Sequence, residues 1–550
     1  MQSIEQIWMS SVARAALFLV VVLSSTAGAR AQDARPLELF TYEELIQLSE
    51  QEPLAEPLAQ KLQRLQTTPF VKNDAAGRNS GPLKPSTPRL GRFLRIASWN
   101  IERGLEYEAV RAALSGSEEF ARVLDQTKFP SGSQQRASIL EQAEHLRQAD
   151  VIVLNEVDWG MKRTGYRNVA AELASALGMN YAWGVEFVEV DPTLLGTEKF
   201  ENAPPEHRAD LVERIQVDTK RYLGLHGSAI LSRYRLENVR LVPLKAQGYD
   251  WYASEKAGAP KLEKLIDKTG EKFFHEKSVR QMRRGGRMML VADISDPDIS
   301  GGKLTVVGTH LEDNTKPGNR RRQIEEVLAQ IKDVANPVVV AGDMNTSTTD
   351  RTPKSFGRVL KKKFGNVGFW VNESIGYATG YGLVLGAAEF IVGTERLYDD
   401  PTVHSVPFFS ENHEVHFFES LKNFRFADGG AFDFRGERDR SYNNREKTLA
   451  NSNERASKGF VETSELAHPV GPFGRFKLDW IFVKLPGSNT PNVKKQPYRF
   501  APHLGRTLAE LNKATAERIS DHNPITVDLP FGDPGATRAP KSRSSRRKTR

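Results

Sequence analysis

Short apolar runs that end in polar side chains recur along the chain. They are Ile96–Glu102, Val151–Glu156, Leu304–His310, Val338–Asn345 and Phe476–Asp479. In a sixth case the order is reversed, because Asp521 and His522 stand just before the apolar run Ile525–Leu529. Continuous apolar runs of this length are typical of buried strands, and a buried carboxylate or imidazole needs a partner. The pattern therefore predicts that six strands bring amides, carboxylates and imidazoles to one site.

Amphipathic helices alternate with these strands. Residues 134–149 are predicted to form a helix that leads straight into the strand beginning at Val151. Residues 319–335 form a second such helix, which leads into a strand over residues 337–341. Two further strands are predicted at residues 227–232 and 288–294. This alternation predicts a layered α/β fold in which helices cover sheets.

The N-terminus has the composition of an export signal. Arg14 precedes the apolar run Ala15–Leu23, and Ala29-Arg-Ala31 fits a signal-peptide cleavage site. Residues 1–31 are therefore expected to be a signal peptide, which would place the protein in the periplasm or outside the cell. An uncleaved anchor is the alternative, although the run is far shorter than the ~20 apolar residues that span a bilayer.

Residues 32–91 are expected to form a helical N-terminal extension and a linker. Thr41 and Glu44 have the spacing of a capping box at the start of a helix, and leucines follow on its apolar faces. Residues 74–91 are rich in Gly, Pro, Ser and Asn, a composition typical of a linker.

Charge and cysteine content further restrict which kinds of site and binding partner this protein can have. The 550-residue chain has no cysteine, which excludes disulfides and thiolate metal sites. Its formal net charge is +8, but residues 536–550 alone carry seven Lys and Arg and no acid, so the body of the chain is close to neutral. The basic tail, residues 531–550, is expected to be disordered. It would bind phosphate polymers or an anionic membrane surface, or be only a solvated end.

Seven motifs occur in an order that resembles one known family. They are Trp99–Gly104, Asn155–Glu156, Ala229–Arg233, Thr309–Leu311, Gly342–Asn345, Asp479–Phe482 and Ser520–His522. The series resembles that of the endonuclease/exonuclease/phosphatase superfamily, which includes pancreatic-type deoxyribonucleases, abasic-site endonucleases, sphingomyelinases and inositol-phosphate 5-phosphatases. The resemblance implies a four-layer αββα sandwich over residues 92–530, with a large insertion at about residues 350–474.

The resemblance also implies a divalent-metal site. Its implied ligands, direct or through water, are Glu156 as the principal one, with Asn100, Glu102 and Asp521 nearby. Carboxylate and amide oxygens suit Mg²⁺, with Mn²⁺ as the alternative. A divalent cation would offset the negative charge that develops on a phosphoester during hydrolysis.

Five further residues are implied to be catalytic. His522 would pair with Asp479, and the two would activate water or stabilise the pentacoordinate phosphorus. Asp343 and Asn345 would position the attacking water, and His310 would contact the phosphate or assist the leaving group.

The chain departs from a minimal member of the superfamily in several places. Asn155 stands where a glutamine commonly precedes the metal-binding glutamate, and Arg287, after two glycines, would be a phosphate clamp. Long insertions are expected at the edge that carries the site. Because loops at such an edge determine which substrate binds, the substrate class stays undecided. The apolar segment Ala378–Val392 would be either a buried element or one that touches a membrane.

The sequence thus predicts an exported, metal-dependent phosphoesterase that hydrolyses phosphodiester bonds. Nucleic acid is the favoured substrate class, so a nuclease is the first hypothesis. A sphingomyelinase-type lipid phosphodiesterase and a phosphomonoesterase are the alternatives. A non-catalytic binding protein ranks last, because the acids and imidazoles of the motifs are intact.

Overall fold

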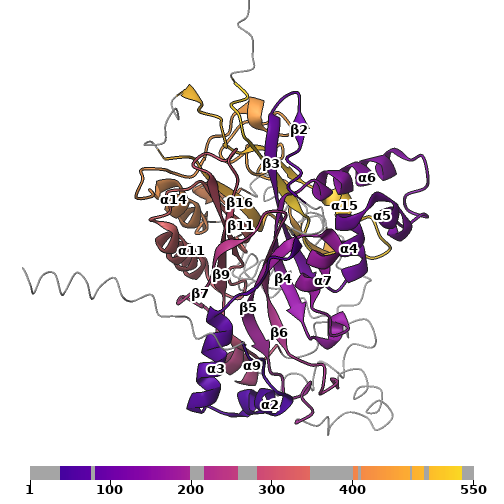
Figure 1. Cartoon of the computed structure of the whole chain (residues 1–550), viewed down its shortest axis with the longest axis vertical. Helices are drawn as coiled ribbons and strands as arrows, with labels where there is room; N and C mark the ends of the chain where they lie inside the picture. Colours follow the sequence, from indigo (N-terminus) through magenta and orange to yellow (C-terminus); the bar gives the residue numbers. More distant parts are fainter. Residues whose placement is uncertain are drawn as a thin grey trace, which may run out of the picture. The chain divides into compact units, whose positions relative to one another are not determined.

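The computed structural model describes residues 37–75, 81–197, 216–257, 281–346, 400–406, 410–470, 473–487 and 495–535. By its contacts the chain divides into two units, Met1–Glu38 and Leu39–Arg550. The second unit contains all the helices and strands described below (Figure 1).

The larger of two main sheets has nine strands. Its path runs through β1 (Phe70–Lys72), β5 (Asn180–Glu189), β6 (Leu225–Ser232), β4 (Val151–Trp159), β3 (Gly91–Arg103), β18 (Ile525–Pro530) and β17 (His503–Thr507). Off this path, β2 (Ser86–Thr87) pairs with β3 and β8 (Arg283–Gly285) pairs with β5. Strands β3 and β4 are parallel, and the other pairs are antiparallel. The last of the described strands therefore lies beside one of the first.

The smaller sheet has five strands. In order they are β16 (Asp479–Lys484), β11 (Val338–Asp343), β10 (Lys303–Thr309), β9 (Met288–Ser295) and β7 (Glu237–Pro243). Only β10 and β11 are parallel. Two ribbons complete the described strands, one of β12 (Ser405–Val406) and β13 (Ser410–Glu411), the other of β14 (Ser464–Val470) and β15 (Phe473–Phe476).

The main core lies between the two sheets. Because side chains alternate along a strand, each strand of the smaller sheet packs on both sides. In β11, Val339 and Ala341 join the cluster that includes Ile96 of β3, whereas Val338 and Val340 join the cluster on the opposite face. The continuous apolar runs in the sequence are explained by this burial on two faces.

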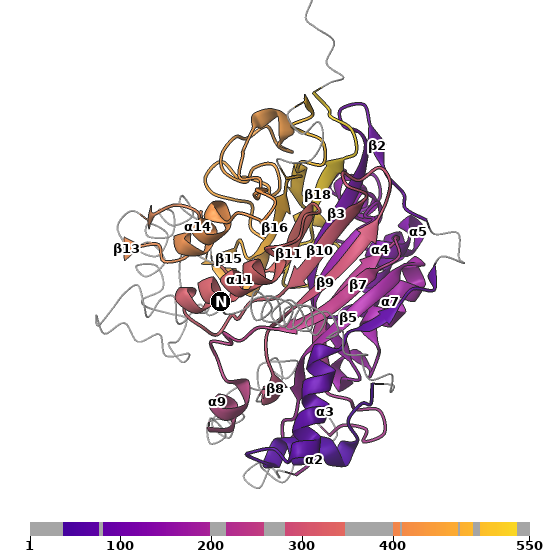
Figure 2. The same cartoon turned by 60° about the vertical axis from the view of Figure 1, so that its left-hand side comes forward.

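Helices cover the outer face of each sheet. The larger sheet is covered by α4 (Tyr107–Ser115), α5 (Ser117–Val123), α6 (Gln134–Arg147), α7 (Val169–Leu177) and the short α15 (Ala509–Asn512), and the smaller by α11 (Pro317–Ile331) and α14 (Val415–Asn423). Figure 2 shows α11 and α14 on one side of the strands and α4, α5 and α7 on the other. The predicted α/β fold, an αββα sandwich, is confirmed.

The predicted N-terminal extension is helical and is held against the sheets. It contains α2 (Tyr42–Glu50) and α3 (Glu56–Thr67), and the capping box at Thr41 is present. Strand β1 then extends the larger sheet at β5. Arg284 of β8 donates to the carbonyl oxygens of Leu48 and Gln51 at 3.0 and 2.6 Å. In the segment expected to be a linker, Lys84 forms ion pairs with Asp296 and Asp298, each at 2.7 Å.

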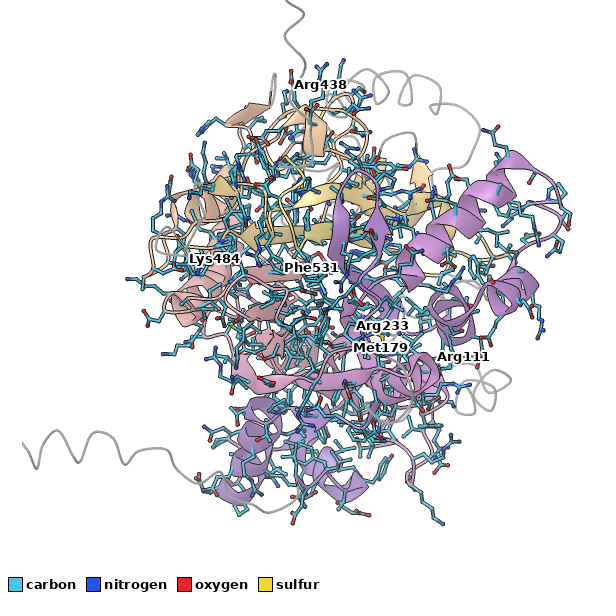
Figure 3. The ribbon with its side chains drawn as sticks, turned by 45° about the horizontal axis from the view of Figure 1, so that its top comes forward. Arg111, Met179, Arg233, Arg438, Lys484 and Phe531 are labelled. Carbon is cyan, nitrogen blue, oxygen red and sulfur yellow. The ribbon has the colours of Figure 1, made fainter. Side chains whose placement is uncertain are left out.

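The described part of the predicted insertion protects an edge of the smaller sheet. The side-chain amide of Asn453 donates to the carbonyl of Ile481 at 2.8 Å and accepts from its N–H at 3.1 Å. Lys484, labelled in Figure 3, donates to the carbonyl oxygens of residues 334–336 at 2.7–3.1 Å and to Asp428 at 2.8 Å. These contacts satisfy polar groups that an edge strand would otherwise leave unpaired.

Several sequence-based predictions concern residues outside the described ranges. They are the signal peptide, the apolar segment 378–392 and most of the basic tail. None of the described helices combines the length and the apolar character that a membrane span requires.

Gly342, in β11, lies against both Thr309 of β10 and Asn155 of the larger sheet. It has a φ of +142°, and a Cβ there would lie 1.9 Å from the carbonyl oxygen of Thr309 and 2.8 Å from Oδ1 of Asn155. Only glycine adopts this conformation readily, and backbone atoms cannot move aside without separating β10 from β11.

Replacing Gly342 by alanine is therefore expected to lower the free energy of unfolding by at least about 2 kcal/mol, from backbone strain and overpacking together. Urea denaturation followed by circular dichroism measures the change. Gly318→Ala in α11 is the control, because a Cβ there meets nothing within 4 Å and φ is not positive. It should be neutral or stabilising by about 0.5 kcal/mol. Equal stability of the two variants would contradict the prediction.

Candidate active site

Two glutamates reach the site through irregularities in the larger sheet. The register of β3 on β4 shifts between Asn100 and Arg103, and that of β4 on β6 shifts between Leu154 and Val157. Glu102 and Glu156 lie at these shifts with φ of +47° and +52°, values that non-glycine residues rarely adopt. A β-bulge changes the direction in which a side chain points without ending the strand. Strand β4 therefore brings Glu156 to the site and continues beyond it to Trp159. The sequence pattern had suggested that the strand ends at Glu156.

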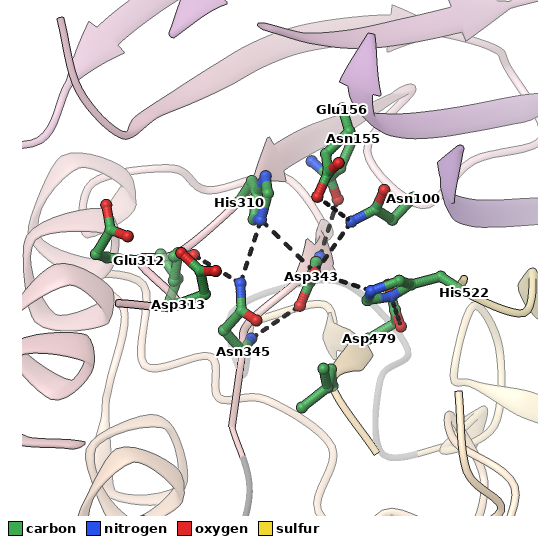
Figure 4. A network of polar contacts seen from close by, with 12 residues as sticks. Asn100, Asn155, Glu156, His310, Glu312, Asp313, Asp343, Asn345, Asp479 and His522 are labelled. Atoms are coloured by element: carbon green, nitrogen blue, oxygen red, sulfur yellow. Dashed lines mark hydrogen bonds and ion pairs between the residues drawn. The ribbon is translucent and has the colours of Figure 1, made fainter. Parts of the chain in front are cut away.

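Asn100 links the larger sheet to the smaller one at the site. Its amide nitrogen donates to Oε1 of Glu156 at 3.0 Å and to Oδ2 of Asp343 at 3.1 Å (Figure 4). Its amide oxygen accepts from the backbone N–H of Glu102 at 3.1 Å. Because Asn100 is fully buried, these bonds fix the distance between the two carboxylates.

Two aspartates of the smaller sheet lie opposite each other. Asp343, at the end of β11, is the direct register partner of Asp479, at the start of β16, and both side chains are fully buried. Asn345 follows with a φ of +48°, and its backbone N–H donates to Oδ1 of Asp343 at 2.9 Å. The side-chain amide of Asn345 donates to the carbonyl oxygen of Leu311 at 2.9 Å.

Two imidazoles converge on the same oxygen of Asp343. Nε2 of His310 and Nε2 of His522 each lie 3.6 Å from its Oδ2 (Figure 4). On its other side, Nδ1 of His522 lies 2.8 Å from Oδ2 of Asp479. An ionised carboxylate can only accept a hydrogen bond, so Nδ1 of His522 carries a proton and its Nε2 faces the site.

Hydroxyl groups hold the backbone that carries the His522 and Asp479 pair. Oγ1 of Thr463 accepts from the N–H groups of Leu478 and Asp479, each at 3.0 Å. Oγ of Ser520 donates to the carbonyl oxygen of Asn100 at 2.7 Å and accepts from the N–H of His522 at 3.1 Å. The pair is thus held by groups from β3, from the residues before β14 and from the residues before β18.

Two groups in the described part of the chain place metal-binding atoms within 4.8 Å of one another. One consists of Glu156, His310 and Asp343, and the other of Asp343, Asp479 and His522. All five of these residues are acids or imidazoles held by fixed neighbours, so this chain offers donors that could hold a divalent cation. Of the four residues implied to be ligands, Glu156 belongs to such a group and Asn100 touches it.

Glu102 and Asp521 lie together beside these groups. Oε2 of Glu102 accepts from the backbone N–H of Asp521 at 2.7 Å. Oδ1 of Asp521 lies 3.8 Å from Nε2 of His522. The structure therefore brings all nine predicted residues to one place, with Glu102 and Asp521 at its side.

A family model decides the family of the chain. The Endonuclease/Exonuclease/phosphatase family model matches residues 97–522, which include every side chain of the site described above. The first residues of β3 and the whole of β18 lie outside the match. The chain belongs to this family. Members of the family are hydrolases that act on phosphoester bonds, and this protein is therefore a phosphoesterase by family. The family membership that the seven motifs implied is confirmed.

Solved structures of the same family are similar to this chain at low sequence identity. An endonuclease/exonuclease/phosphatase protein from Beutenbergia cavernae is 17% identical, with a TM-score of 0.34, over 80% of this chain and 72% of the other. The human Nocturnin catalytic domain with bound sulfate is 13% identical, with a TM-score of 0.33, over 84% and 97%. The 3'-5' exonuclease NExo from Neisseria meningitidis is 12% identical, with a TM-score of 0.34, over 79% and 99%. No curated protein matches the chain.

Arg287 does not have the surroundings of the phosphate clamp that the sequence suggested. Its side chain is 3% exposed and is already bonded on every side by protein groups. Nη1 donates to Glu186 at 3.0 Å, Nε to Glu312 at 3.3 Å and Nη2 to Asp313 at 3.4 Å. Nη1 also lies 2.8 Å from Nδ1 of His310. A guanidinium surrounded in this way has little capacity left for a phosphate, so this interpretation was wrong.

Sequence reasoning missed Glu186 and Glu312, which hold Arg287. Glu186 is fully buried in β5, at a third register shift of the larger sheet, between Val185 and Phe187. Glu186 and Glu189 are two acids within the otherwise largely apolar run Tyr181–Val190, and this was the signal that could have identified Glu186. Burial raises the pKa of Glu312 to about 7, although the nearby Arg287 guanidinium opposes this rise.

Asn155, the residue that departs from the commoner glutamine, binds across the two sheets. Its amide nitrogen donates to Oγ of Ser228 at 3.0 Å and to the carbonyl oxygen of Thr309 at 3.3 Å. Its amide oxygen accepts from the N–H of Asp343 at 2.9 Å. Asn155 therefore positions the backbone of Asp343. In the described contacts it does not touch the imidazoles of His310 and His522.

Replacing Asp479 by asparagine tests the His522 pair. The amide oxygen can still accept from Nδ1 of His522, but the negative charge that stabilises a protonated ring is lost. We expect phosphoester hydrolysis to fall about 100-fold or more while the urea midpoint changes little. Asp333→Asn is the matched control, because Asp333 is exposed beyond the end of α11. A variant with normal activity would show that the pair has no catalytic role.

Proposed function

We propose that this protein is an exported phosphodiesterase that depends on a divalent metal ion and acts on nucleic acid. The observation that supports this most strongly is the convergence of His310 and His522 on the buried carboxylate of Asp343. The family match supports phosphoester chemistry in general. Metal dependence, export and the substrate class are the parts that we add.

Glu156 is the residue that we assign first to a metal ion, with Asp343 and the amide of Asn100 beside it. The carboxylate oxygens of Glu156 and Asp343 are hard ligands, which suit Mg²⁺ better than a soft or thiolate-binding metal, and the amide nitrogen of Asn100 donates to both of them. When bound, the cation offsets the negative charge of the phosphate and of its transition state. The bulge at Glu156 and its positive φ hold the carboxylate on the site side of β4.

His522 is the residue that we assign to activation of water. Asp479 orients the ring through Nδ1 and leaves Nε2 directed at the centre of the site. A ring held in this way can take a proton from water at Nε2, and the adjacent carboxylate stabilises the imidazolium that forms. Asp343 and Asn345 border the same space and would hold the water or a phosphate oxygen by hydrogen bonds.

Two imidazoles suit an in-line displacement at a phosphoester. The leaving group of a diester, like that of a monoester, is an alkoxide, which needs a hydrogen-bond or proton donor on the side opposite the attacking water. His310 lies on the other side of Asp343 from His522 and could supply that donor. A single imidazole would leave one of the two oxygens of an in-line displacement without a partner.

Nucleic acid is the diester that we propose. The seven Lys and Arg of residues 536–550 are a source of phosphate contacts, and such contacts supply most of the affinity for nucleic acid. The apolar run near the N-terminus supports export. Lipid diesters were proposed because of residues 378–392, which lie outside the described part of the chain, and no described contact favours them.

Hydrolysis of supercoiled plasmid DNA with Mg²⁺ tests the proposed function. We expect cleavage that stops on addition of EDTA and returns with excess Mg²⁺. Glu156→Gln should lower the rate about 100-fold or more, because the neutral amide loses the charge that holds a cation. Glu144→Gln, on the exposed face of α6, should cleave like the natural sequence.

Sphingomyelin vesicles and a phosphomonoester, assayed in parallel, separate the alternatives. Hydrolysis of vesicles or of the monoester without DNA cleavage would reject the nuclease and keep the phosphoesterase. DNA cleavage that survives EDTA would reject the metal-dependent mechanism.

A further inference from the structure

The two histidines of the site have opposite partners at Nδ1. Nδ1 of His522 faces the carboxylate of Asp479 at 2.8 Å, whereas Nδ1 of His310 faces the guanidinium of Arg287 at 2.8 Å. A carboxylate can only accept and a guanidinium can only donate. The same ring atom is therefore a donor in one histidine and an acceptor in the other.

Arg287 remains a cation in its buried position. Glu186, Glu312 and Asp313 all lie within 3.4 Å of its guanidinium nitrogens. Although burial alone would lower the pKa of Arg287, the carboxylates of Glu312 and Glu186 outweigh it and raise the pKa. The ring of Phe187, whose centroid lies 5.2 Å from the guanidinium carbon, closes a further side. A cation fixed on this many sides cannot turn away from His310 without leaving buried carboxylates unpaired.

We propose that Arg287 fixes the tautomer of His310, so that Nδ1 is unprotonated and Nε2 carries the only ring proton. His310 is then a permanent hydrogen-bond donor toward Asp343 and the reacting phosphate, and His522 is the acceptor. A proton on Nδ1 would point at the N–H of Arg287 at 2.8 Å. Arg287 is in this sense a positioning residue that acts through His310.

Other groups around the His310 ring favour the opposite tautomer. Oε2 of Glu186 lies 3.8 Å from Nδ1, and Nδ2 of Asn345 lies 3.2 Å from Nε2. Together they could hold a ring with its proton on Nδ1. The Arg287 contact is shorter than both and comes from a charged donor, which makes the stronger hydrogen bond. The amide of Asn345 also has another acceptor, the carbonyl of Leu311 at 2.9 Å.

The assigned tautomer has a consequence for the metal site. An imidazole binds a metal through a nitrogen lone pair, and the only lone pair of His310 would point at Arg287. His310 would therefore not be a ligand, although it lies close enough to Glu156 and Asp343 to be one. This leaves the carboxylate oxygens of Glu156 and Asp343 as the donors of that group, in agreement with Mg²⁺.

Nitrogen NMR of the whole protein, labelled with ¹⁵N in its histidine rings, tests the assignment without any substrate. His310→Gln identifies the signals of His310. We expect a proton on Nε2 and an unprotonated Nδ1 at pH 7, both before and after addition of Mg²⁺. Protonation of Nδ1 in the natural sequence, or a change to it on metal binding, would overturn the proposal.

Two substitutions of Arg287 distinguish the effect of its charge and hydrogen bond from the effect of its size. In Arg287→Met, Nδ1 loses its donor, and we expect the proton to move to Nδ1 and to face Glu186. In Arg287→Lys the ammonium can still donate to Nδ1, so we expect the tautomer of the natural sequence. Arg321→Met, on the exposed face of α11, is the matched control and should change nothing. An unchanged tautomer in Arg287→Met would overturn the proposal.

Arg287→Met leaves buried carboxylates without their cation, so the double variant with Glu312→Gln is a second form of the test. It removes one of those charges and keeps Glu186 beside the ring. Circular dichroism confirms that each variant is folded before its spectrum is interpreted. The spectrum of the natural sequence decides the assignment even if neither variant folds.

The catalytic part of the inference rests on the proposed function. If DNA is cleaved, Arg287→Met should lower kcat about 100-fold with KM within about threefold, and Arg287→Lys should recover most of the rate. If Arg287→Met instead raises KM and leaves kcat unchanged, Arg287 acts in binding and the positioning role is wrong. If the natural protein cleaves no phosphoester, the proposed function fails, while the tautomer is still decided by the spectra.

Discussion

The hydrogen bonds of one buried amide set the distance between the two sheets at the site. Asn155 belongs to the larger sheet, yet it accepts from the backbone of Asp343 and donates to that of Thr309, both in the smaller sheet. Apolar packing alone would allow the sheets to slide, because burial free energy depends on area and not on direction. Directional bonds remove that freedom. The carboxylates of Glu156 and Asp343 come within reach of the single amide of Asn100 as a result.

Around this fixed distance the chain places residues in conformations that are rare elsewhere. Glu102, Glu156 and Asn345 all have positive φ, and each of them touches another group of the site. Such conformations cost free energy, and they persist only where the surrounding bonds determine the backbone. The hydroxyls of Thr463 and Ser520 have the same effect near Asp479 and His522. The site is thus held rigidly by the fold before any ligand arrives.

The strands, the covering helices and the polar residues of the site could be predicted from the sequence. Runs such as Val338–Asn345 are apolar on both faces of a strand, so they are recognisable without any knowledge of their partners. The bulges could not be predicted, because one additional residue in an apolar run changes neither its composition nor its length noticeably. For the same reason β4 was expected to end at Glu156 and in fact continues to Trp159.

The role of Arg287 could not be predicted because it depends on residues far apart in the sequence. Glu186, 101 positions earlier, and Glu312, 25 positions later, convert an arginine after two glycines from a candidate anion site into a neutralised one. The residues next to Arg287 in the sequence do not indicate which distant side chains contact it in the fold. Asn155 gave the opposite result: it was noted only as a substitution next to a metal ligand, whereas it joins the two sheets.

The place of β18 in the larger sheet has a consequence for how the protein is made. This strand comes from residues 525–530 but lies beside β3, which begins at Gly91. His522 and Asp521 precede it directly. During synthesis from the N-terminus, the middle of the larger sheet and half of the site cannot form until almost the whole chain has been made. Contacts between residues so far apart in the sequence also form slowly. An incomplete chain that ends before β18 therefore has the carboxylate of Asp479 in place without a settled position for its partner His522.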